Sequence, residues 1–225
     1  MDITERATGI GALADETRRA LYEFISAQTG PTGRDAAAEA IGIPTHMARF
    51  HLDKLVEVGL LETEFRRLSG RTGPGAGRPS KLYRRVSETV GVSLPERRYD
   101  LVGHLLAGAI ERAADGTPLS DAIGEVAREE GRRIAASVQA TDESDDLTRV
   151  TEVLDAHGYE PRRADDALIL ANCPFDSLAR DHTALVCSAN LALVDGIIDG
   201  LGCGGLCAHG EPHDGQCCVA VRPAG

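Results

Sequence analysis

The stretch Pro44-Thr-His-Met-Ala-Arg-Phe-His-Leu-Asp-Lys-Leu-Val-Glu-Val58 has the residue pattern of a surface helix, and the glycine that follows at position 59 can end it. Three apolar residues recur at helical spacing and predict a buried face: Ala48, Leu52 and Leu55. A shorter, alanine-rich helix is predicted just upstream, over residues 34–41, and Gly42 stops it. A short helix, a tight glycine turn and a second helix make up a helix-turn-helix arrangement.

The segments on either side extend this arrangement into a winged domain. A first helix is predicted over residues 9–28, and two strands are predicted over 60–65 and 81–86. The strands enclose a loop at residues 69–80 that is rich in Gly, Pro and Arg. Together the two strands and the loop are expected to form a long hairpin, or wing.

The formal net charge of −11 is unevenly distributed along the chain. Residues 1–95 hold 13 Lys and Arg against 12 Asp and Glu, whereas the remaining residues hold 11 against 23. Around the wing, residues 66–85 hold seven basic side chains and no acidic one. A polyanion such as DNA responds to this local basic block rather than to the total charge.

The face of the predicted helix opposite its buried residues carries side chains that can reach base edges and phosphates in a major groove. The tip of the wing can place an arginine in a minor groove. We therefore predict that double-stranded DNA is contacted by Thr45, His46, Arg49, Phe50, Lys54, Arg71, Arg78 and Lys81. The alternative is that the helix face is merely solvated.

Residues 10–86 resemble an ArsR-type winged helix. The string Met47-Ala-Arg-Phe-His-Leu-Asp-Lys-Leu-Val-Glu-Val-Gly-Leu60 and the later string Gly75-Ala-Gly-Arg-Pro-Ser-Lys-Leu-Tyr-Arg84 are similar to actinobacterial regulators grouped with SufR-type repressors. The resemblance covers about a third of the chain. It implies a homodimer on a partly palindromic operator.

The predicted fold class is α+β, in three segments. A winged helix-turn-helix occupies residues 1–95, helices over 99–113 and 119–139 form a dimerisation segment within 96–141, and a small α+β metal-binding domain occupies 142–225. The central helices have apolar stripes without an evident partner, so we expect them to pair across a two-fold axis. In the last segment, helices and strands are predicted over 147–157, 159–163, 167–172, 184–200 and 217–222, with a short helix after Pro174 and a glycine-rich loop before the last strand.

Composition indicates a globular protein of the cytoplasm. Of the 225 residues 42% are hydrophobic and 26% are charged, and no apolar run approaches the roughly 20 residues needed to cross a bilayer. Asp2 and Glu5 do not fit the positively charged start of a signal peptide. We therefore expect no membrane association.

Six cysteines lie in the last 53 residues: Cys173, Cys187, Cys203, Cys207, Cys217 and Cys218. Cytoplasmic thiols are kept reduced, so these cysteines indicate metal ligation or redox chemistry rather than disulfides. They come from separate predicted elements that could converge on one point. A set of thiolates suits an iron-sulfur cluster or zinc.

The order Cys-Pro-Phe, His-x4-Cys, a helix ending in Gly-Cys and a final strand that begins with Cys looks like the cluster-binding half of SufR-type sensors. This resemblance implies an iron-sulfur cluster, [4Fe–4S] in preference to [2Fe–2S], on Cys173, Cys187, Cys203 and Cys217. Cys207 could replace Cys203, and Cys218 could replace Cys217. We prefer Cys217 because it shares a strand face, at period two, with the apolar residues that follow it.

Other interpretations remain open for these cysteines. Zinc could be held by Cys203, Cys207, His209 and His213, and two of the thiols could simply be buried apolar groups. The last domain could also sense a small organic ligand. A thiol-dependent enzyme using His182 is disfavoured, because neither paired carboxylates nor a nucleophile elbow accompany it. The sequence thus predicts a non-enzymatic regulator, a repressor in the first instance, whose DNA affinity follows cluster occupancy or redox state.

Overall fold

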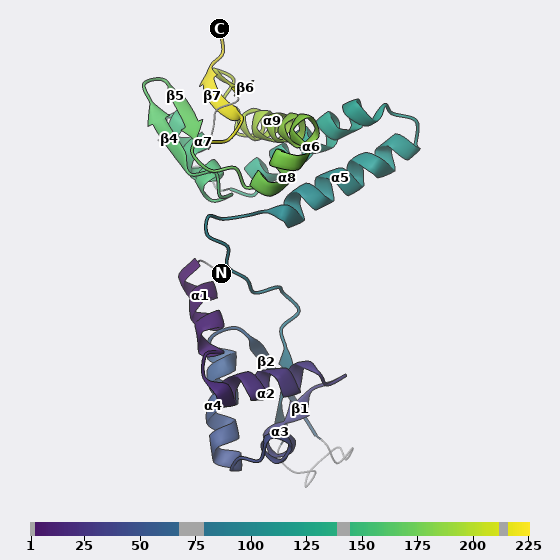
Figure 1. Ribbon diagram of the computed structural model, residues 1–225, viewed down its shortest axis with the longest axis vertical. Coiled ribbons are helices and arrows are strands. Elements are labelled where there is room, and N and C mark those ends of the chain that lie inside the picture. The colour runs from purple at the N-terminus through teal and green to yellow at the C-terminus, as the bar shows by residue number, and fades with distance from the viewer. Residues whose placement is uncertain (1–2, 68–78, 139–144, 212–215) are drawn as a thin grey trace. The chain divides into compact units, whose positions relative to one another are not determined.

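The computed structural model describes residues 3–67, 79–138, 145–211 and 216–225. The chain forms two compact units, Met1–Val92 and Ser93–Gly225, each built of helices and one antiparallel sheet (Figure 1). The central helices, which we expected as a segment of their own, belong to the same compact unit as the C-terminal residues. The protein is therefore a mixed helix and sheet structure with a helix-turn-helix in its first unit.

The first unit contains four helices and three strands among its described residues. The helices are α1 (Ile3–Ala12), α2 (Glu16–Ser26), α3 (Arg34–Ile41) and α4 (Thr45–Glu57), and the strands are β1 (Thr32–Gly33), β2 (Leu61–Arg66) and β3 (Ser80–Arg85). The sheet order is β1-β3-β2, and both pairings are antiparallel.

The single helix predicted over residues 9–28 is two helices. Asp15 caps the start of α2, where its carboxylate accepts a hydrogen bond from the backbone N–H of Arg18 at 2.9 Å. An aspartate at this position satisfies one of the N–H groups that a helix leaves unpaired at its start. The helical spacing of the apolar residues continues through this break, so spacing alone did not reveal it.

The helix-turn-helix and the wing strands lie where the sequence predicts them. Ala48, Leu52 and Leu55 are fully buried, and they pack with residues of α2 and β3. Gly42 ends α3 with a φ of 71°, a left-handed conformation that favours glycine. Strands β2 and β3 pair along their whole length, but most of the predicted wing loop lies outside the described residues.

The second unit contains five helices and four strands among its described residues. The helices are α5 (Tyr99–Ala114), α6 (Leu119–Ala136), α7 (Asp146–Asp155), α8 (Asp176–Asp181) and α9 (Thr183–Gly200), and the strands are β4 (Pro161–Ala164), β5 (Ala167–Leu170), β6 (Leu206–Gly210) and β7 (Val219–Pro223). The antiparallel sheet has the order β4-β5-β7-β6. Strand β6 falls where we predicted only a glycine-rich loop, because its pairing with β7, not a local pattern, makes it a strand.

The apolar stripes of the central helices find partners within the same chain. Helix α6 lies side by side with α9 and also packs on α5 (Figure 1). Two glycines let α6 and α9 approach backbone to backbone: a Cβ atom on Gly131 would lie 2.2 Å from the Leu193 carbonyl oxygen, and one on Gly196 would lie 2.3 Å from that of Arg128. Most apolar residues of these helices are therefore covered within the chain, while Ile110 on α5 is 63% exposed.

Helix α9 is the one described helix that is long and apolar enough to cross a membrane. Half of this helix is buried inside the protein, which is the behaviour of a core helix. Its packing against α6 accounts for its apolar composition.

Candidate nucleic-acid interface and four-thiol site

The exposed face of α4 carries the five side chains that the sequence predicts to contact DNA. Thr45, His46, Arg49 and Phe50 are exposed, and Lys54 is half-buried. The Phe50 ring is 64% exposed, which is unusual for a large apolar side chain. An exposed ring on a helix of this kind can contact a thymine methyl group, and the neighbouring arginine can reach base edges or phosphates.

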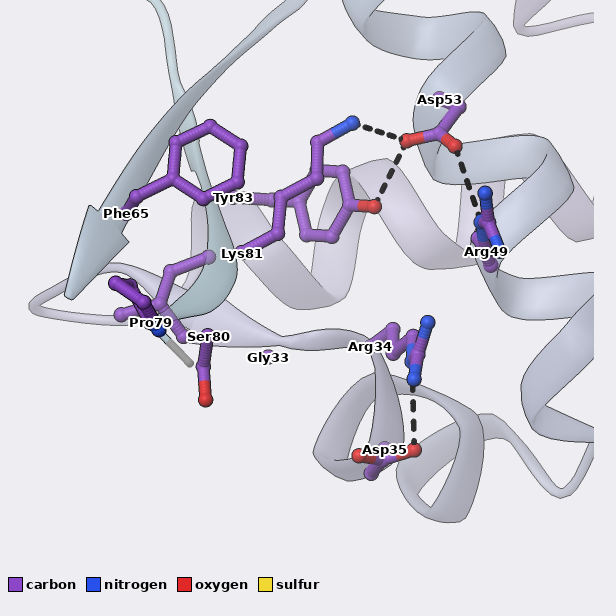
Figure 2. Close-up of a pocket in the computed structure, with 11 residues that line it drawn as sticks. Gly33, Arg34, Asp35, Arg49, Asp53, Phe65, Pro79, Ser80, Lys81 and Tyr83 are labelled. Carbon is purple, nitrogen blue, oxygen red and sulfur yellow. Dashed lines mark hydrogen bonds and ion pairs between the residues drawn. The ribbon is translucent and has the colours of Figure 1, made fainter. Parts of the chain in front are cut away.

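Asp53 joins this helix to the wing. Its Oδ1 atom accepts hydrogen bonds from Lys81 Nζ at 2.6 Å and from the Tyr83 hydroxyl at 2.8 Å, and its Oδ2 atom lies 3.6 Å from Arg49 Nε (Figure 2). Partial burial raises the pKa of Asp53, but the hydrogen bonds from Lys81 and Tyr83 outweigh burial and hold that pKa below its ordinary value of 3.8. Asp53 is therefore a carboxylate that orients two predicted DNA contacts.

A pocket of about 490 Å³ lies around this carboxylate, between α3, α4 and β3 (Figure 2). Three cationic side chains line it: Arg34, Arg49 and Lys81. Asp35 pairs with Arg34 at 3.8 Å, so two carboxylates balance part of this charge. Because the cations are held on three different elements, the pocket can accept a phosphate group that competes with the carboxylates for them.

The sequence analysis missed most residues of this pocket, among them Arg34, Asp53 and Tyr83. Asp53 follows Arg49 by four residues on a helix, a spacing at which opposite charges meet, so that signal was available. Tyr83 reaches Asp53 only through the pairing of distant segments. Of the predicted wing contacts, Lys81 lies in the pocket, whereas Arg71 and Arg78 lie outside the described residues.

Four cysteines of the second unit come together from three segments, and we call them the four-thiol site: Cys173, Cys187, Cys217 and Cys218. Cys173 follows β5, Cys187 lies on α9, and the other two precede β7. The Cys217 thiol hydrogen-bonds with Cys173 and Cys218, and Cys187 hydrogen-bonds with Cys218. The backbone N–H of Cys217 donates to the Leu170 carbonyl at 3.0 Å, which holds this segment against the end of β5.

The hydrogen bonds divide the four thiols into donors and acceptors. The hydrogen bond from Cys217 lowers the pKa of Cys218 to about 6 against the opposing effect of burial, and Cys187 and Asn190 lower it further. Hydrogen bonds with Cys173 and Cys218, together with burial, raise the pKa of Cys217 well above its ordinary value. Cys218 is half-buried and favours the thiolate, which is the form in which cysteine binds metals.

A second layer of polar groups supports the site from the core. Asn190 is fully buried on α9, one turn after Cys187, and its Nδ2 atom donates to Cys217 Sγ at 3.1 Å. The Tyr159 hydroxyl donates to Asn190 Oδ1 at 2.6 Å. Burial raises the pKa of Tyr159 well above its ordinary value, and the nearby cysteines raise it further, so Tyr159 keeps its proton. Both polar groups of Asn190 are therefore satisfied, and its amide is aimed at sulfur.

Cys203 does not join the other predicted ligands. It follows the C-terminal end of α9, and its Sγ atom faces the Asp146 and Leu201 carbonyls. Cys187 lies near the opposite end of this helix, which rises about 1.5 Å per residue, so roughly 20 Å of helix separates the two. In the four-thiol site, Cys218 lies with Cys173, Cys187 and Cys217, and Cys203 does not.

The presence of both Cys217 and Cys218 in the four-thiol site has a local reason. We predicted that Cys217 shares the buried face of a strand, an alternation that would turn Cys218 to the other face, but β7 begins only at Val219. Two consecutive residues outside a strand are not bound by its alternation, so both thiols can turn to the same side.

Cys207 belongs to a different part of the unit. It lies on β6, and its Sγ atom is 3.0 Å from His209 Nε2. These are two of the four ligands of the zinc alternative, while Cys203 faces the core and His213 lies outside the described residues. Among the interactions of the described residues, none joins His182 to a cysteine.

The donor chemistry of the four-thiol site fits an iron-sulfur cluster. Four thiols, buried or half-buried, with an amide donor to one sulfur, are the groups that such clusters use. Within the described ranges, no group of three or more His, Cys, Asp or Glu side chains is arranged to hold a single metal ion. The thiols instead hydrogen-bond with one another.

Comparison with known proteins supports the helix-turn-helix of the first unit. Residues 13–64, which run from the residues before α2 into β2, match a family model described as a helix-turn-helix domain. No curated protein and no solved structure shows a significant match to the chain. A domain of this kind is typical of transcription regulators. The similarity of residues 13–64 to a helix-turn-helix domain therefore indicates a DNA-binding transcription regulator.

Proposed function

We propose that this chain is a homodimeric transcriptional repressor whose affinity for operator DNA is controlled by an iron-sulfur cluster on the four-thiol site. One observation carries the sensing half: thiols from three segments far apart in sequence meet at one buried point beside the amide of Asn190. The DNA-binding half rests on the exposed face of α4 and on its link to the wing through Asp53.

DNA recognition follows from the geometry of the first unit. With its apolar face buried, α4 can enter a major groove and present Arg49 and Phe50 to the base edges. Lys81 would then meet the phosphates beside the groove, because Asp53 holds it next to the same helix. A dimer would place two such helices on successive turns of the duplex, which accounts for the expected palindromic operator.

Sensing would depend on how the second unit holds the cluster. Cys173, Cys187, Cys217 and Cys218 would be its ligands, and Asn190 would donate a hydrogen bond to the Cys217 sulfur. Tyr159 and Phe175, both fully buried, would exclude water from this side. When bound, the cluster supplies a centre that responds to oxidants or to iron supply. A cytoplasmic location, where thiols stay reduced, is part of the proposal.

The test is anaerobic purification followed by measurement of iron and acid-labile sulfide per chain, with two matched variants. Cys218→Ala should lose the cluster, whereas Cys203→Ala, which also removes a buried thiol near α9, should keep it. This ligand set would be overturned if folded Cys203→Ala protein lacked the cluster while Cys218→Ala protein retained it. A colourless protein without sulfide would exclude the cluster altogether.

Zinc is a second candidate because Cys207 and His209 lie in contact on β6. Stoichiometric zinc in the purified protein that is lost in Cys207→Ala, with Cys187→Ala unaffected, would favour it. The cluster proposal instead expects iron and sulfide to be lost in Cys187→Ala and kept in Cys207→Ala.

The DNA half is tested by selection from random-sequence duplex DNA. We expect a partly palindromic site and, in sedimentation, a dimer that binds one duplex. Recovery of no preferred sequence, or a monomer at every concentration, would contradict the proposed mode of binding.

A further inference from the structure

Residues 93–98, which we call the connector, lead from the first unit into α5. The Arg97 side chain, 20% exposed, binds the loop that carries Cys173. Its Nη1 atom donates to Asn172 Oδ1 at 2.6 Å and to the Cys173 carbonyl at 3.4 Å, and its Nη2 atom lies 3.7 Å from Asp176 Oδ2. One guanidinium thus holds three groups of residues 172–176.

The backbone of the connector is anchored to the same loop. The buried Asn172 amide donates to the Glu96 carbonyl at 3.1 Å, and the Arg98 N–H donates to the Pro174 carbonyl at 3.0 Å. These two anchors flank Cys173 on either side. A change in the position of Cys173 must therefore be absorbed by the connector or by the hydrogen bonds that hold it.

These anchors differ from ordinary surface ion pairs. Asn172 is 6% exposed and also donates to the Gly158 carbonyl, so its amide has little freedom to find other partners. The bond from Arg97 to this amide is assisted by charge, and such bonds are shorter and stronger than neutral ones. The bond to the Cys173 carbonyl, at 3.4 Å, is already near the limit of a hydrogen bond and would break with a small displacement.

We propose that Arg97 and Asn172 couple the four-thiol site to the DNA-binding unit by clamping the connector onto the Cys173 loop. This inference rests on the proposed function for its physiological signal, although the clamp itself exists without any metal. Ligation of Cys173 would draw its sulfur away from Cys217 and shift the carbonyls that Arg97 and Arg98 hold. Arg97 is thus a positioning residue that acts through the connector, and none of its hydrogen bonds and ion pairs described above involves a thiol.

The consequence for DNA binding is entropic. Two recognition helices must be held at a fixed spacing to occupy both half-sites. A loosened connector leaves each DNA-binding unit more freedom, and binding must then remove that freedom. A clamp that responds to Cys173 would therefore change operator affinity without touching α4.

The first test uses hydrogen exchange on the full-length, metal-free protein. Arg97→Ala should accelerate exchange of the Arg97 and Arg98 amides about tenfold or more, because the latter donates to the Pro174 carbonyl. Arg132→Ala is the matched control, since it removes an exposed pair with Asp199, at 3.1 Å, in the same unit. If the alanine variant does not fold, Arg97→Lys replaces it, because lysine keeps the positive charge but lacks the two Nη atoms of the guanidinium. Unchanged connector exchange in a folded Arg97 variant overturns the clamp.

The coupling is tested with two serine variants of the four-thiol site, again without metal. Cys173→Ser should change exchange in the connector, whereas Cys187→Ser, on α9, should not. Equal effects of the two variants, or no effect of either, overturn the coupling even if the clamp is present.

The last test compares operator affinity of the metal-free protein with that of protein reconstituted anaerobically with iron and sulfide. Arg97→Ala should bring the ratio of the two affinities at least fivefold closer to one than in the wild type. An unaltered ratio overturns the role of Arg97. If the two affinities of the wild type are equal, both the proposed sensing function and the regulatory role of Arg97 are overturned. The hydrogen-exchange results still decide whether the clamp exists.

Discussion

Helices α4 and α9 both carry candidate functional residues, but they are buried to different extents. Three of the 13 residues of α4 are buried, whereas nine of the 18 residues of α9 are. The candidate residues of α4 therefore face outward, where a partner from outside the protein can reach them. Those of α9 face other elements of the same unit. The first helix is suited to recognition and the second to the assembly of an internal site.

This difference predicts how each helix responds to substitution. A change on the exposed face of α4 should alter binding and leave folding intact. A change on α9 or its partner α6 should alter stability first.

The contact between α6 and α9 should tolerate no added methyl group. Gly131→Ala places a Cβ atom 2.2 Å from the Leu193 carbonyl oxygen, and only a backbone shift can relieve that clash. We expect a loss of about 3 kcal/mol in the stability of the second unit. Thermal denaturation measures this, with Gly124→Ala on the same helix as the control, since the nearest atom to its Cβ is a flexible arginine end at 3.5 Å. Equal stability of the two variants would contradict the close packing.

The second-largest loss of stability is expected from removing the buried amide of Asn190 on α9. Asn190→Ala leaves the Tyr159 hydroxyl without its acceptor in a fully buried place, which costs about 1–3 kcal/mol. The Cys217 sulfur also loses its donor, so a cluster on the four-thiol site should be lost faster in air. Chemical denaturation of the metal-free protein and the rate of bleaching of the loaded protein separate the two effects. Asn190→Ala with wild-type stability would show that this hydrogen bond is dispensable.

On α4, Arg49→Ala should weaken operator binding roughly tenfold, or about 1.4 kcal/mol, and leave stability unchanged. Arg49 is exposed, and its pair with Asp53, at 3.6 Å, is a surface contact. If the side chain contacts a phosphate, the slope of log affinity against log salt should fall by about 1. Fluorescence anisotropy at several salt concentrations measures both quantities. Arg132→Ala, which changes the second unit, should alter neither.

The smallest effect is a pH dependence of the first unit. The pKa of Asp53 is lowered on folding, so its interactions with Lys81 and Tyr83 stabilise the unit above its ordinary pKa of 3.8 and are lost as the pH falls through the lowered value. Asp53→Asn cannot titrate. Its denaturation midpoint should therefore change less than that of the wild type between about pH 5 and about pH 2. Parallel curves for both proteins would rule out this contribution.

Local residue spacing was enough to predict the helix-turn-helix and its exposed face. Residues 34–58 form two adjacent helices whose burial is set by spacing, because a helix repeats every 3.6 residues and its pattern is local. The wing strands and most elements of the second unit were predictable for the same reason. The break at Asp15 was missed because a cap is set by one side chain, not by a period.

Contacts between distant segments set where the thiols meet and what covers the central helices. Cys173, Cys187 and Cys218 are separated by loops whose paths depend on the order of strands β5, β7 and β6, which no local pattern specifies. The same holds for α6, whose partner α9 lies more than 40 residues further along the chain. Contacts between distant segments are selected by packing and hydrogen bonding of the whole unit, and therefore Cys218 rather than Cys203 lies in the four-thiol site.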